Sequence, residues 1–373
     1  MLSISPFYRL RLPGPTAVPE RVRQAIALPV LNHRGPEFRA VLGRAEELIK
    51  PVLGTTNPVL FFASSGTGAM EASLVNVVAP GERVLVCIHG QFGDRFAAIA
   101  QSIGAEVDQL QFEWGTAIDP AVVAAKLKTA DYRAVVVIHN ESSTGIYSDL
   151  AALGKIVRDT PALLIADSVS GLGGLEMRQD EWGVDIVVSS SQKALMCPPG
   201  VGIASVSAKA WDIVNRETKM PRFYWDFRKA KKSIEANETP FTTPVSLMAG
   251  LVEALEMMHA EGLDNVLARH RKLSVRLREG CNALGLATFG KSNQLSTTVV
   301  ALAVPEPLNG GDIVKRMYER HKTVIAGSRN KMQGRVIRIG TMGFFTDGDI
   351  ATDLLHLEAT LADLGWPVKA ARA

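Results

Sequence analysis

Asp167 and Lys193, two side chains of opposite charge, stand at the ends of two successive apolar runs, 26 residues apart. Short apolar runs of this kind are typical of strands buried in a parallel sheet, and ligands bind at the edge where such strands end. A lysine in buried surroundings binds its proton less tightly, so its amine can act as a nucleophile and then as a base. A carboxylate at the neighbouring strand end can keep a ring nitrogen protonated. This pair therefore predicts a centre for covalent chemistry on an amine.

A turn rich in Ser, Gly and Thr, residues 64–68, also follows an apolar run and precedes a helical pattern. The free N–H groups and the dipole at such a helix start attract a phosphate. Taken singly, this turn is equally compatible with a helix cap, Asp167 with a turn residue and Lys193 with a surface lysine. Together with the flat ring of Phe92, these are the parts needed to hold pyridoxal phosphate, whose protonated ring is an electron sink.

Elements of two kinds must position these side chains. Five apolar runs rich in β-branched residues predict strands at Val59–Ala63, Arg83–Ile88, Ala134–His139, Ala162–Ala166 and Val184–Ser189. Helical periodicity between most of them predicts helices at Ala69–Val78, Phe96–Ile103, Pro120–Leu127 and Asp149–Arg158. Continuous hydrophobicity indicates strands buried on both faces, and their alternation with helices predicts an α/β domain with a mainly parallel sheet.

The pattern changes after about residue 261. We expect a long helix at Asn265–Leu284, a strand at Ser296–Val304 and a second helix after Asp312. A strand pair at Thr323–Ala326 and Arg335–Gly340 is expected next, and a last helix after the capping-box pattern at Thr346–Asp349. The chain is therefore expected to contain an N-terminal arm, residues 1–14, a large domain, residues 15–261, and a smaller α+β domain, residues 262–373.

Several segments match one known family, in the same order along the chain. They are Leu12–Thr16, Asn32–Phe38, Ser65–Thr67, Glu141–Gly145, Asp167–Ser170, Ser189–Ala194 with Pro198–Gly200, Thr242–Pro244 and Arg338–Gly340. The sequence resembles the class V aminotransferases of the alanine/serine:glyoxylate (or pyruvate) type over nearly its whole length. The resemblance implies the fold of pyridoxal-phosphate transferases, in which a large α/β/α domain surrounds a mainly parallel sheet and a smaller α+β domain follows.

The resemblance also implies roles for residues around the cofactor ring. By it, Lys193 carries pyridoxal 5'-phosphate as a Schiff base, and Asp167 pairs with the ring nitrogen. Phe92 takes the stacking position, where relatives often have Trp, and Ser143 lies near the ring oxygen.

Further implied roles concern the phosphate and the substrate. The phosphate is expected to be held by Ser65, Gly66, Thr67 and Gln192. Thr242, together with Thr239, is expected to reach the phosphate of a neighbouring subunit, which implies a homodimer with a shared active site. Arg338, helped by the backbone near Gly14, is expected to bind the substrate carboxylate.

The implied activity is a transamination by ping-pong exchange. A small amino acid, alanine or serine, loses its amino group, Lys193 moves the proton from its Cα, and glyoxylate or pyruvate takes the amino group up. The loop Gly327–Lys331 carries two cations where family members often have several glycines. It is compatible with a solvated turn or with a different donor, such as 2-aminoethylphosphonate or a ureido amino acid. The sequence does not name the physiological donor or the pathway.

Three rival interpretations remain. Residues 285–292 satisfy the Walker A pattern, but they follow a predicted helix and precede a strand, the reverse of a P-loop. Cysteine desulfurases usually have His before the Schiff-base lysine and a mobile catalytic cysteine, whereas Gln192 precedes Lys193 and Cys281 falls in a predicted helix. A catalytically silent scaffold of the same fold is not distinguished by pattern alone, although the lysine, the aspartate and the arginine are all present.

Composition limits the remaining functions. The 373 residues include 41 Lys and Arg against 38 Asp and Glu, and a net charge of +3 is too small for a nucleic-acid or membrane-surface footprint. The three cysteines are too widely spaced for a disulfide framework or a C-x-x-C metal site. Apolar runs stay far below the ~18 residues of a membrane span. Pro6 and two arginines argue against a signal peptide, and residues 371–373 match no peroxisomal signal. We expect a cytoplasmic protein without a bound metal.

Overall fold

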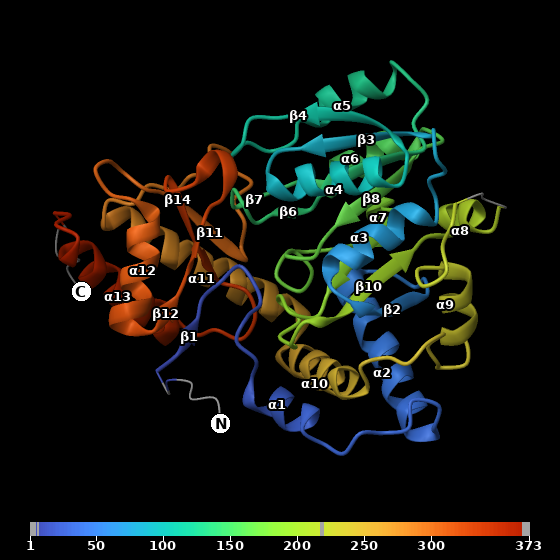
Figure 1. Ribbon diagram of the computed structural model, residues 1–373, viewed down its shortest axis with the longest axis horizontal. Helices are drawn as coiled ribbons and strands as arrows, with labels where there is room; N and C mark the ends of the chain where they lie inside the picture. The colour runs from blue at the N-terminus through green and yellow to red at the C-terminus, as the bar shows by residue number, and fades with distance from the viewer. Residues whose placement is uncertain (1–4, 6, 217–219, 368–373) are drawn as a thin grey trace.

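A seven-stranded sheet forms the centre of the larger part of the molecule (Figure 1). The computed structural model describes residues 5, 7–216 and 220–367, so Pro6 and residues 371–373 lie outside it. The strands follow the order β2, β10, β9, β8, β5, β3, β4. Their bounds are β2 Val59–Ser64, β3 Arg83–Ile88, β4 Glu106–Gln111, β5 Ala134–Ile138, β8 Leu163–Asp167, β9 Ile186–Ser190 and β10 Gly200–Val206. Only β10 runs antiparallel to its neighbours in this sheet, which confirms the expected, mainly parallel arrangement.

All five predicted strands of this sheet are present, and two further strands were missed. Every residue of β5 is buried, which explains its continuous rather than alternating hydrophobicity. The missed β4 is an edge strand of sequence EVDQLQ with much of its surface in contact with solvent, so it has no apolar run. The missed β10 is rich in small residues, GVGIASV, because it passes close to its neighbours at the site described below.

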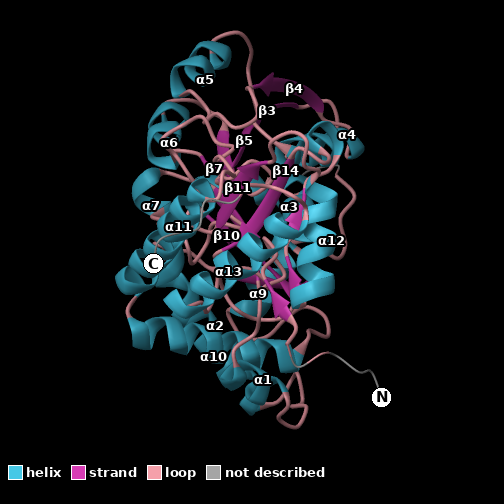
Figure 2. Cartoon of the chain, turned by 90° about the vertical axis from the view of Figure 1, so that its left-hand side faces the viewer, coloured by secondary structure: helices cyan, strands magenta, loops and turns pink. Residues whose placement is uncertain are grey.

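Helices cover both faces of this sheet. Figure 2 shows α3 and α4 on one side and α6 and α7 on the other. The helices of this part are α1 Glu20–Ile26, α2 Pro36–Leu53, α3 Gly66–Val75, α4 Gln91–Ser102, α5 Pro120–Leu127, α6 Leu150–Arg158, α7 Gln179–Trp182, α8 Ala208–Val214, α9 Phe227–Ile234 and α10 Val245–Glu261. The predicted bounds of α5 agree at both ends, whereas α3 and α4 begin earlier than predicted, directly at the strand ends where ligands can bind.

The C-terminal part has its own three-stranded sheet and its own cluster of buried side chains, from Leu273 to Leu361. Its elements are α11 Leu263–Ala283, β11 Val299–Ala303, α12 Gly310–His321, β12 Thr323–Val324, β13 Ala326–Gly327, the 3-10 helix η1 Asn330–Met332, β14 Val336–Gly340 and α13 Asp347–Asp363. The capping box at Thr346 is present as predicted. The Walker A pattern joins α11 to β11 and opens no helix. The domain boundaries at residues 14 and 261 stay a prediction.

The strand pair predicted near Thr323 is only partly correct. β13 pairs with β14, as expected for that pair, but β12 pairs in parallel with β1, Arg9–Leu10, from the N-terminal arm. Figure 1 shows this blue segment among the orange elements of the C-terminal part. A partner 314 positions away in sequence leaves no local signal, which is why the pattern around Thr323 suggested the wrong neighbour.

Two kinds of feature are absent from residues 5, 7–216 and 220–367. None of the helices there is long and apolar enough to cross a membrane. The same part of the chain contains no cluster of three or more His, Cys, Asp or Glu side chains suited to a metal ion. Its three cysteines are free and buried.

Candidate active site

The candidate site lies at the edge where the parallel strands end. β8 ends in Asp167, and β9 ends in Ser190, three residues before Lys193. β10 returns between β9 and β2, with Gly202 opposite Ser190 and Gly200 opposite Ser64. A Cβ on Gly202 would lie 2.3 Å from Ser64 Oγ, so β10 passes close to the end of β2 here. The sheet thus brings the lysine, the aspartate and the Ser/Gly/Thr turn to one edge, as the sequence predicts.

Lys193 is almost fully buried, with 9% of its surface exposed. Its Nζ donates a hydrogen bond to the carbonyl oxygen of Pro13, and its backbone carbonyl accepts one from Thr16 Oγ1 at 3.1 Å. Gly14 has φ +99°, and a Cβ there would lie only 2.6 Å from Lys193 Nζ. Burial lowers the pKa of Lys193 to about 8; Arg338 and Arg95 act in the same direction, and Asp167 opposes them. Near neutral pH the amine of Lys193 is therefore neutral and nucleophilic far more often than the amine of an ordinary lysine.

Asp167 is a buried carboxylate without an ion-pair partner among the described residues. Its Oδ1 accepts a hydrogen bond from the backbone N–H of Val169 at 2.8 Å. Burial raises the pKa of Asp167 to about 6, and the charge of Glu141 adds to this effect. Its neighbour Ser168 bonds Nδ1 of the buried His139 at 2.8 Å. A protonated ring nitrogen placed beside Asp167 would supply the missing positive charge, which fits pyridoxal phosphate.

The turn at the start of α3 is shaped to receive an anion. Ser65 stands at the N-cap position of α3 without forming a side-chain cap, so first-turn N–H groups of the helix are available. A Cβ on Gly66 would lie 2.7 Å from Val169 Cγ2 and 3.0 Å from Ser190 Oγ, so the backbone passes tightly here. Thr67 Oγ1 accepts a hydrogen bond from Arg95 at 3.3 Å. In the described part of the chain, Ser190 Oγ and Gln192 Oε1 are buried without any hydrogen-bond partner.

Phe92 and Ser143 are held by one buried carboxylate, that of Glu141. Glu141 Oε2 accepts hydrogen bonds from the N–H groups of Phe92 at 2.9 Å and Gly93 at 3.3 Å, at the start of α4. Glu141 Oε1 accepts one from the Ser143 hydroxyl at 2.5 Å, and that hydroxyl in turn accepts from Gln91 N–H at 3.0 Å. The guanidinium of Arg95 lies over the Phe92 ring, 4.8 Å from its centre. The carboxylate therefore fixes the backbone of Phe92 at the start of α4, at the edge where the strands end.

Arg338, on β14, reaches the site from the C-terminal part. Its Nη1 donates to the carbonyl oxygen of Ser142 at 3.1 Å and its Nη2 to that of Gly327 at 2.8 Å. Its Nε is buried and has no hydrogen-bond partner among the described residues. Burial lowers the pKa of Arg338, and the nearby charge of Glu141 opposes this effect. Because neutral carbonyls hold this guanidinium, its charge is left for a carboxylate ligand.

Thr239 and Thr242 lie apart from these groups. Thr239 is buried, and its hydroxyl donates to the carbonyl oxygen of Phe241 at 2.8 Å. Thr242 is exposed and lines a shallow surface hollow beside β2. Within residues 5, 7–216 and 220–367, no hydrogen bond joins either threonine to Lys193 or to the turn at Ser65. Their expected role toward a neighbouring subunit is therefore not visible in one chain.

Comparisons with known proteins agree with this geometry. A family model described as Aminotransferase class-V matches residues 20–346. The chain belongs to the class V aminotransferases. It is 39% identical over 368 residues to a serine–glyoxylate aminotransferase of Hyphomicrobium methylovorum, covering 96% of this chain and 91% of the relative. It is 38% identical over 361 residues to a Synechococcus protein named "Soluble hydrogenase, small subunit", covering 96% and 94%. The crystal structure of a ureidoglycine–glyoxylate aminotransferase from Bacillus subtilis superposes with a TM-score of 0.93 at 28% identity, covering 100% and 97%.

Some residues of this aminotransferase site were not predicted from the sequence. From the sequence, Glu141 is named only within the family-like segment Glu141–Gly145, although this side chain organises the start of α4, and no role is assigned to Ser190 or Arg95. The N-cap position of α4 is Gly90, which has no side chain to cap the helix. An uncapped helix start beside an acidic strand end is the signal that could have indicated Glu141.

Proposed function

We propose that this class V aminotransferase transfers the amino group of a small amino acid, serine or alanine, to a 2-oxo acid, glyoxylate or pyruvate, by a ping-pong exchange. One observation carries the proposal: the guanidinium of Arg338, which bonds carbonyl oxygens and forms no ion pair in the described residues, lies near enough to the buried amine of Lys193 to lower the pKa of that amine. An α-amino carboxylate has the two groups that such a pair would bind. Two of the similar proteins have glyoxylate in their names but different donors, which supports the acceptor more than the donor.

Pyridoxal phosphate, when bound, supplies the carbonyl carbon and the electron-withdrawing ring that the exchange needs. In the proposed site, Asp167 holds a proton on the ring nitrogen and Phe92 stacks on the ring. Ser65, Gly66, Thr67 and Gln192 bind the phosphate, and Ser143 lies near the ring oxygen. The orphaned hydroxyl of Ser190, which can donate a hydrogen bond, supports an anion at this position. Lys193 would take the proton from the substrate Cα and deliver it to the cofactor carbon, while Arg338 and the backbone near Gly14 orient the carboxylate.

A donor with an extra acidic or ureido group is a second candidate. Arg329 follows β13, and its charge adds to the effects that lower the pKa of Arg338. Two guanidinium groups near one another favour a substrate with two anionic or strongly polar ends. Such a substrate would use the same lysine and aspartate, so only the choice of donor separates the two candidates.

We further propose a homodimer in which Thr242 reaches the neighbouring phosphate site. Exposed aromatic side chains surround it: Phe223, 70% exposed, and Tyr224 both stack on Phe241. Apolar rings on a surface next to an exposed hydroxyl fit an interface between two copies. Sedimentation that finds a fully active monomer would contradict this arrangement. A cytoplasmic location is proposed as well, since the three cysteines are free.

The decisive experiment combines chemical trapping with a substrate panel. Borohydride reduction of cofactor-saturated protein, followed by peptide mapping, should place the adduct on Lys193. An adduct elsewhere, or none, would overturn the assignment of the lysine. Alanine, serine, aspartate and 2-aminoethylphosphonate are then compared as donors against glyoxylate and pyruvate. A stronger reaction with 2-aminoethylphosphonate than with alanine and serine would overturn the proposed donor while leaving the lysine assignment intact.

A further inference from the structure

The N-terminal strap, residues 9–16, connects the C-terminal part of the molecule to Lys193. At one end, Arg11 N–H donates to the carbonyl oxygen of Val324 at 2.9 Å, and Arg11 accepts from Gly340 N–H at 2.8 Å. At the other end, Pro13 accepts from Lys193 Nζ, and Thr16 N–H donates to the carbonyl oxygen of Gln192 at 3.2 Å. One short segment is thus bonded both to the C-terminal sheets and to the lysine segment.

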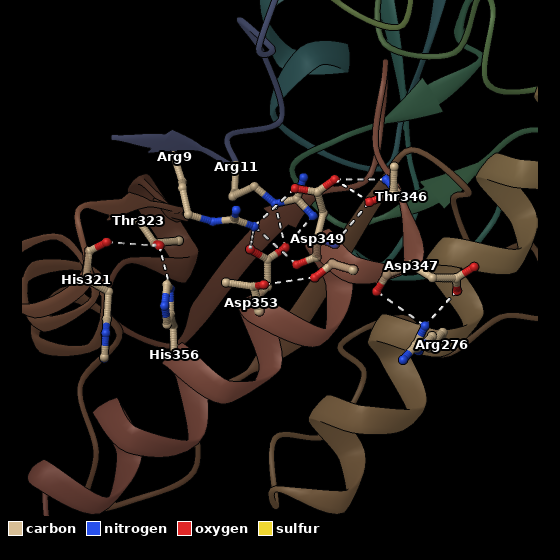
Figure 3. A network of polar contacts seen from close by, with 12 residues as sticks. Arg9, Arg11, Arg276, His321, Thr323, Thr346, Asp347, Asp349, Asp353 and His356 are labelled. Atoms are coloured by element: carbon tan, nitrogen blue, oxygen red, sulfur yellow. Dashed lines mark hydrogen bonds and ion pairs between the residues drawn. The ribbon is translucent and has the colours of Figure 1, made fainter. Parts of the chain in front are cut away.

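A buried ion pair anchors the first end of the strap. Arg11 lies in the strap and Asp353 on α13, and each is 1% exposed. The Arg11 guanidinium contacts Asp353 Oδ2 through both Nε and Nη2. The Arg11 guanidinium also lies over the ring of Phe345, 3.7 Å from its centre. Arg9 contacts Asp353 Oδ1 at 3.2 Å and Asp349 at 3.3 Å (Figure 3). This packing fixes both the position and the direction of the strap where it leaves α13.

Burying this ion pair costs free energy, because both charges are removed from water. Burial alone raises the pKa of Asp353 and lowers that of Arg11, because each charge loses its water. A pair of apolar side chains of similar size often gives equal or greater stability at a buried position. A buried pair with a defined hydrogen-bond geometry instead selects one register of the chain over its neighbours. The pair therefore fixes the placement of residues 12–14, which follow Arg11 directly along the chain.

The second end of the strap shields the amine of Lys193. A Cβ on Gly340 would overlap the carbonyl oxygen of Leu12, so the strap lies directly against β14. Gly14 then packs on the Lys193 side chain with no room for a Cβ. The charged groups that act on Lys193 are Asp167, Arg338 and Arg95, and none of them belongs to the strap. The strap therefore acts on the lysine by excluding water and through the carbonyl oxygen of Pro13.

We propose that Arg11 and Asp353 are positioning residues for Lys193. Their ion pair holds Pro13 and Gly14 against the amine of Lys193 and shields that amine from water. The inference rests on the proposed role of Lys193. It predicts that loosening the ion pair lets water reach the amine without altering any charge beside it. Desolvation is the largest cause of the low pKa of Lys193. If the strap moves away and water reaches the amine, the pKa of Lys193 should therefore rise.

The test compares Asp353→Asn with Asp347→Asn in the full-length, cofactor-free protein. Both positions are on α13, but Asp347 pairs with Lys272 and Arg276 and has no bond to the strap. Competitive labelling with trace acetic anhydride over a pH series, read by mass spectrometry, gives the titration midpoint of Lys193. We expect Asp353→Asn to raise the midpoint by about one pH unit. Asp347→Asn should leave it unchanged.

Hydrogen exchange of a peptide covering residues 9–16 is followed in the same samples. Faster exchange in Asp353→Asn together with the raised midpoint supports the proposal. An unchanged midpoint overturns it, whatever the exchange does, and so does an equal rise in both variants. If Asp353→Asn does not fold, Arg11→Lys keeps the charge but loses the planar fork, and a smaller rise of the same sign is expected. A missing borohydride adduct on Lys193 in the unaltered protein would refute the proposed function instead, without changing the midpoint.

Discussion

Two clusters of charged side chains in this protein are built in opposite ways. In the cluster of buried Arg11 and Asp353 with half-buried Arg9 and Asp349, every charge faces one of the opposite sign at hydrogen-bond distance. At the sheet edge, Asp167 and Lys193 are buried and Arg338 is half-buried, yet none of them forms an ion pair with another described residue. Arg338 is held by carbonyl oxygens, Lys193 by a carbonyl oxygen and Asp167 by one N–H.

The difference indicates which charges serve the fold and which serve a ligand. A buried charge without a counter-charge lowers stability, since the folded chain gives up hydration and gains little in return. Such groups persist where a bound molecule completes them. The cofactor ring nitrogen would supply a counter-charge to Asp167, and the substrate carboxylate would supply one to Arg338. Arg11 and Asp353 already supply counter-charges to each other. Substitutions in the two clusters should therefore affect different measurements.

Asp167→Asn should show the largest effect, and it should act on turnover rather than folding. Loss of the charge that keeps the ring nitrogen protonated is expected to reduce kcat by about 10³-fold or more, since each ~1.4 kcal/mol in the barrier is tenfold in rate. In the cofactor-free protein the folded-state pKa of Asp167, about 6, is above its unfolded value. The ionised carboxylate therefore costs roughly 1 to 3 kcal/mol at neutral pH, and Asn removes this cost. Steady-state kinetics and urea unfolding measure the two quantities. Near-normal turnover with cofactor bound would contradict the assigned role.

Arg11→Met should show the reverse pattern. Removing one partner leaves Asp353 buried without its main counter-charge, which costs about 3 to 5 kcal/mol in the free energy of unfolding. The matched control is Arg338→Met, for which we expect a loss of only about 1 kcal/mol, because that guanidinium bonds carbonyl oxygens and forms no ion pair with a described acid. Urea midpoints of the two cofactor-free variants provide the comparison. Equal losses would show that the two arginines are not distinguished by their partners.

The sequence predicted the edge of the sheet better than it predicted the cluster on α13. Asp167 and Lys193 end neighbouring strands, so a local pattern and the geometry of parallel sheets suffice to bring them together. Arg11 and Asp353 are 342 positions apart, and no local pattern around either residue predicts their contact. β10 and the role of Glu141 were missed for a similar reason. Small residues form a strand in β10 because β2 and β9 lie beside it, and Glu141 has its role because α4 starts next to it, and neither neighbour is evident from local sequence. The unpaired atoms of Ser190 and Gln192 are visible only when all other partners are known.

Arg338→Lys should reduce kcat/KM by about 10-fold to 150-fold, the equivalent of roughly 1.5 to 3 kcal/mol. A lysine keeps the charge but cannot offer two parallel N–H donors to a carboxylate. KM should rise for the amino acid and the 2-oxo acid together, while cofactor affinity changes little. Steady-state kinetics with each substrate varied in turn and a cofactor titration measure these quantities. A normal KM for both carboxylates would remove Arg338 from the substrate site and make it a structural arginine like Arg11.

The smallest effect concerns pH, and it tests whether the amine of Lys193 is really left without a counter-charge. The pKa of Lys193 is lowered to about 8, so at pH 7 about one amine in ten is neutral, against roughly one in 2,500 for an ordinary lysine. Only the neutral amine attacks the cofactor aldehyde. The rate of cofactor capture by cofactor-free protein should therefore rise about tenfold per pH unit below pH 8 and become constant above it. Stopped-flow absorbance follows the reaction, with Nα-acetyl-lysine as the reference amine. A rate that continues to rise beyond pH 9 would mean that Lys193 is as well solvated or as well paired as the charges beside Arg11, and the contrast between the two clusters would disappear.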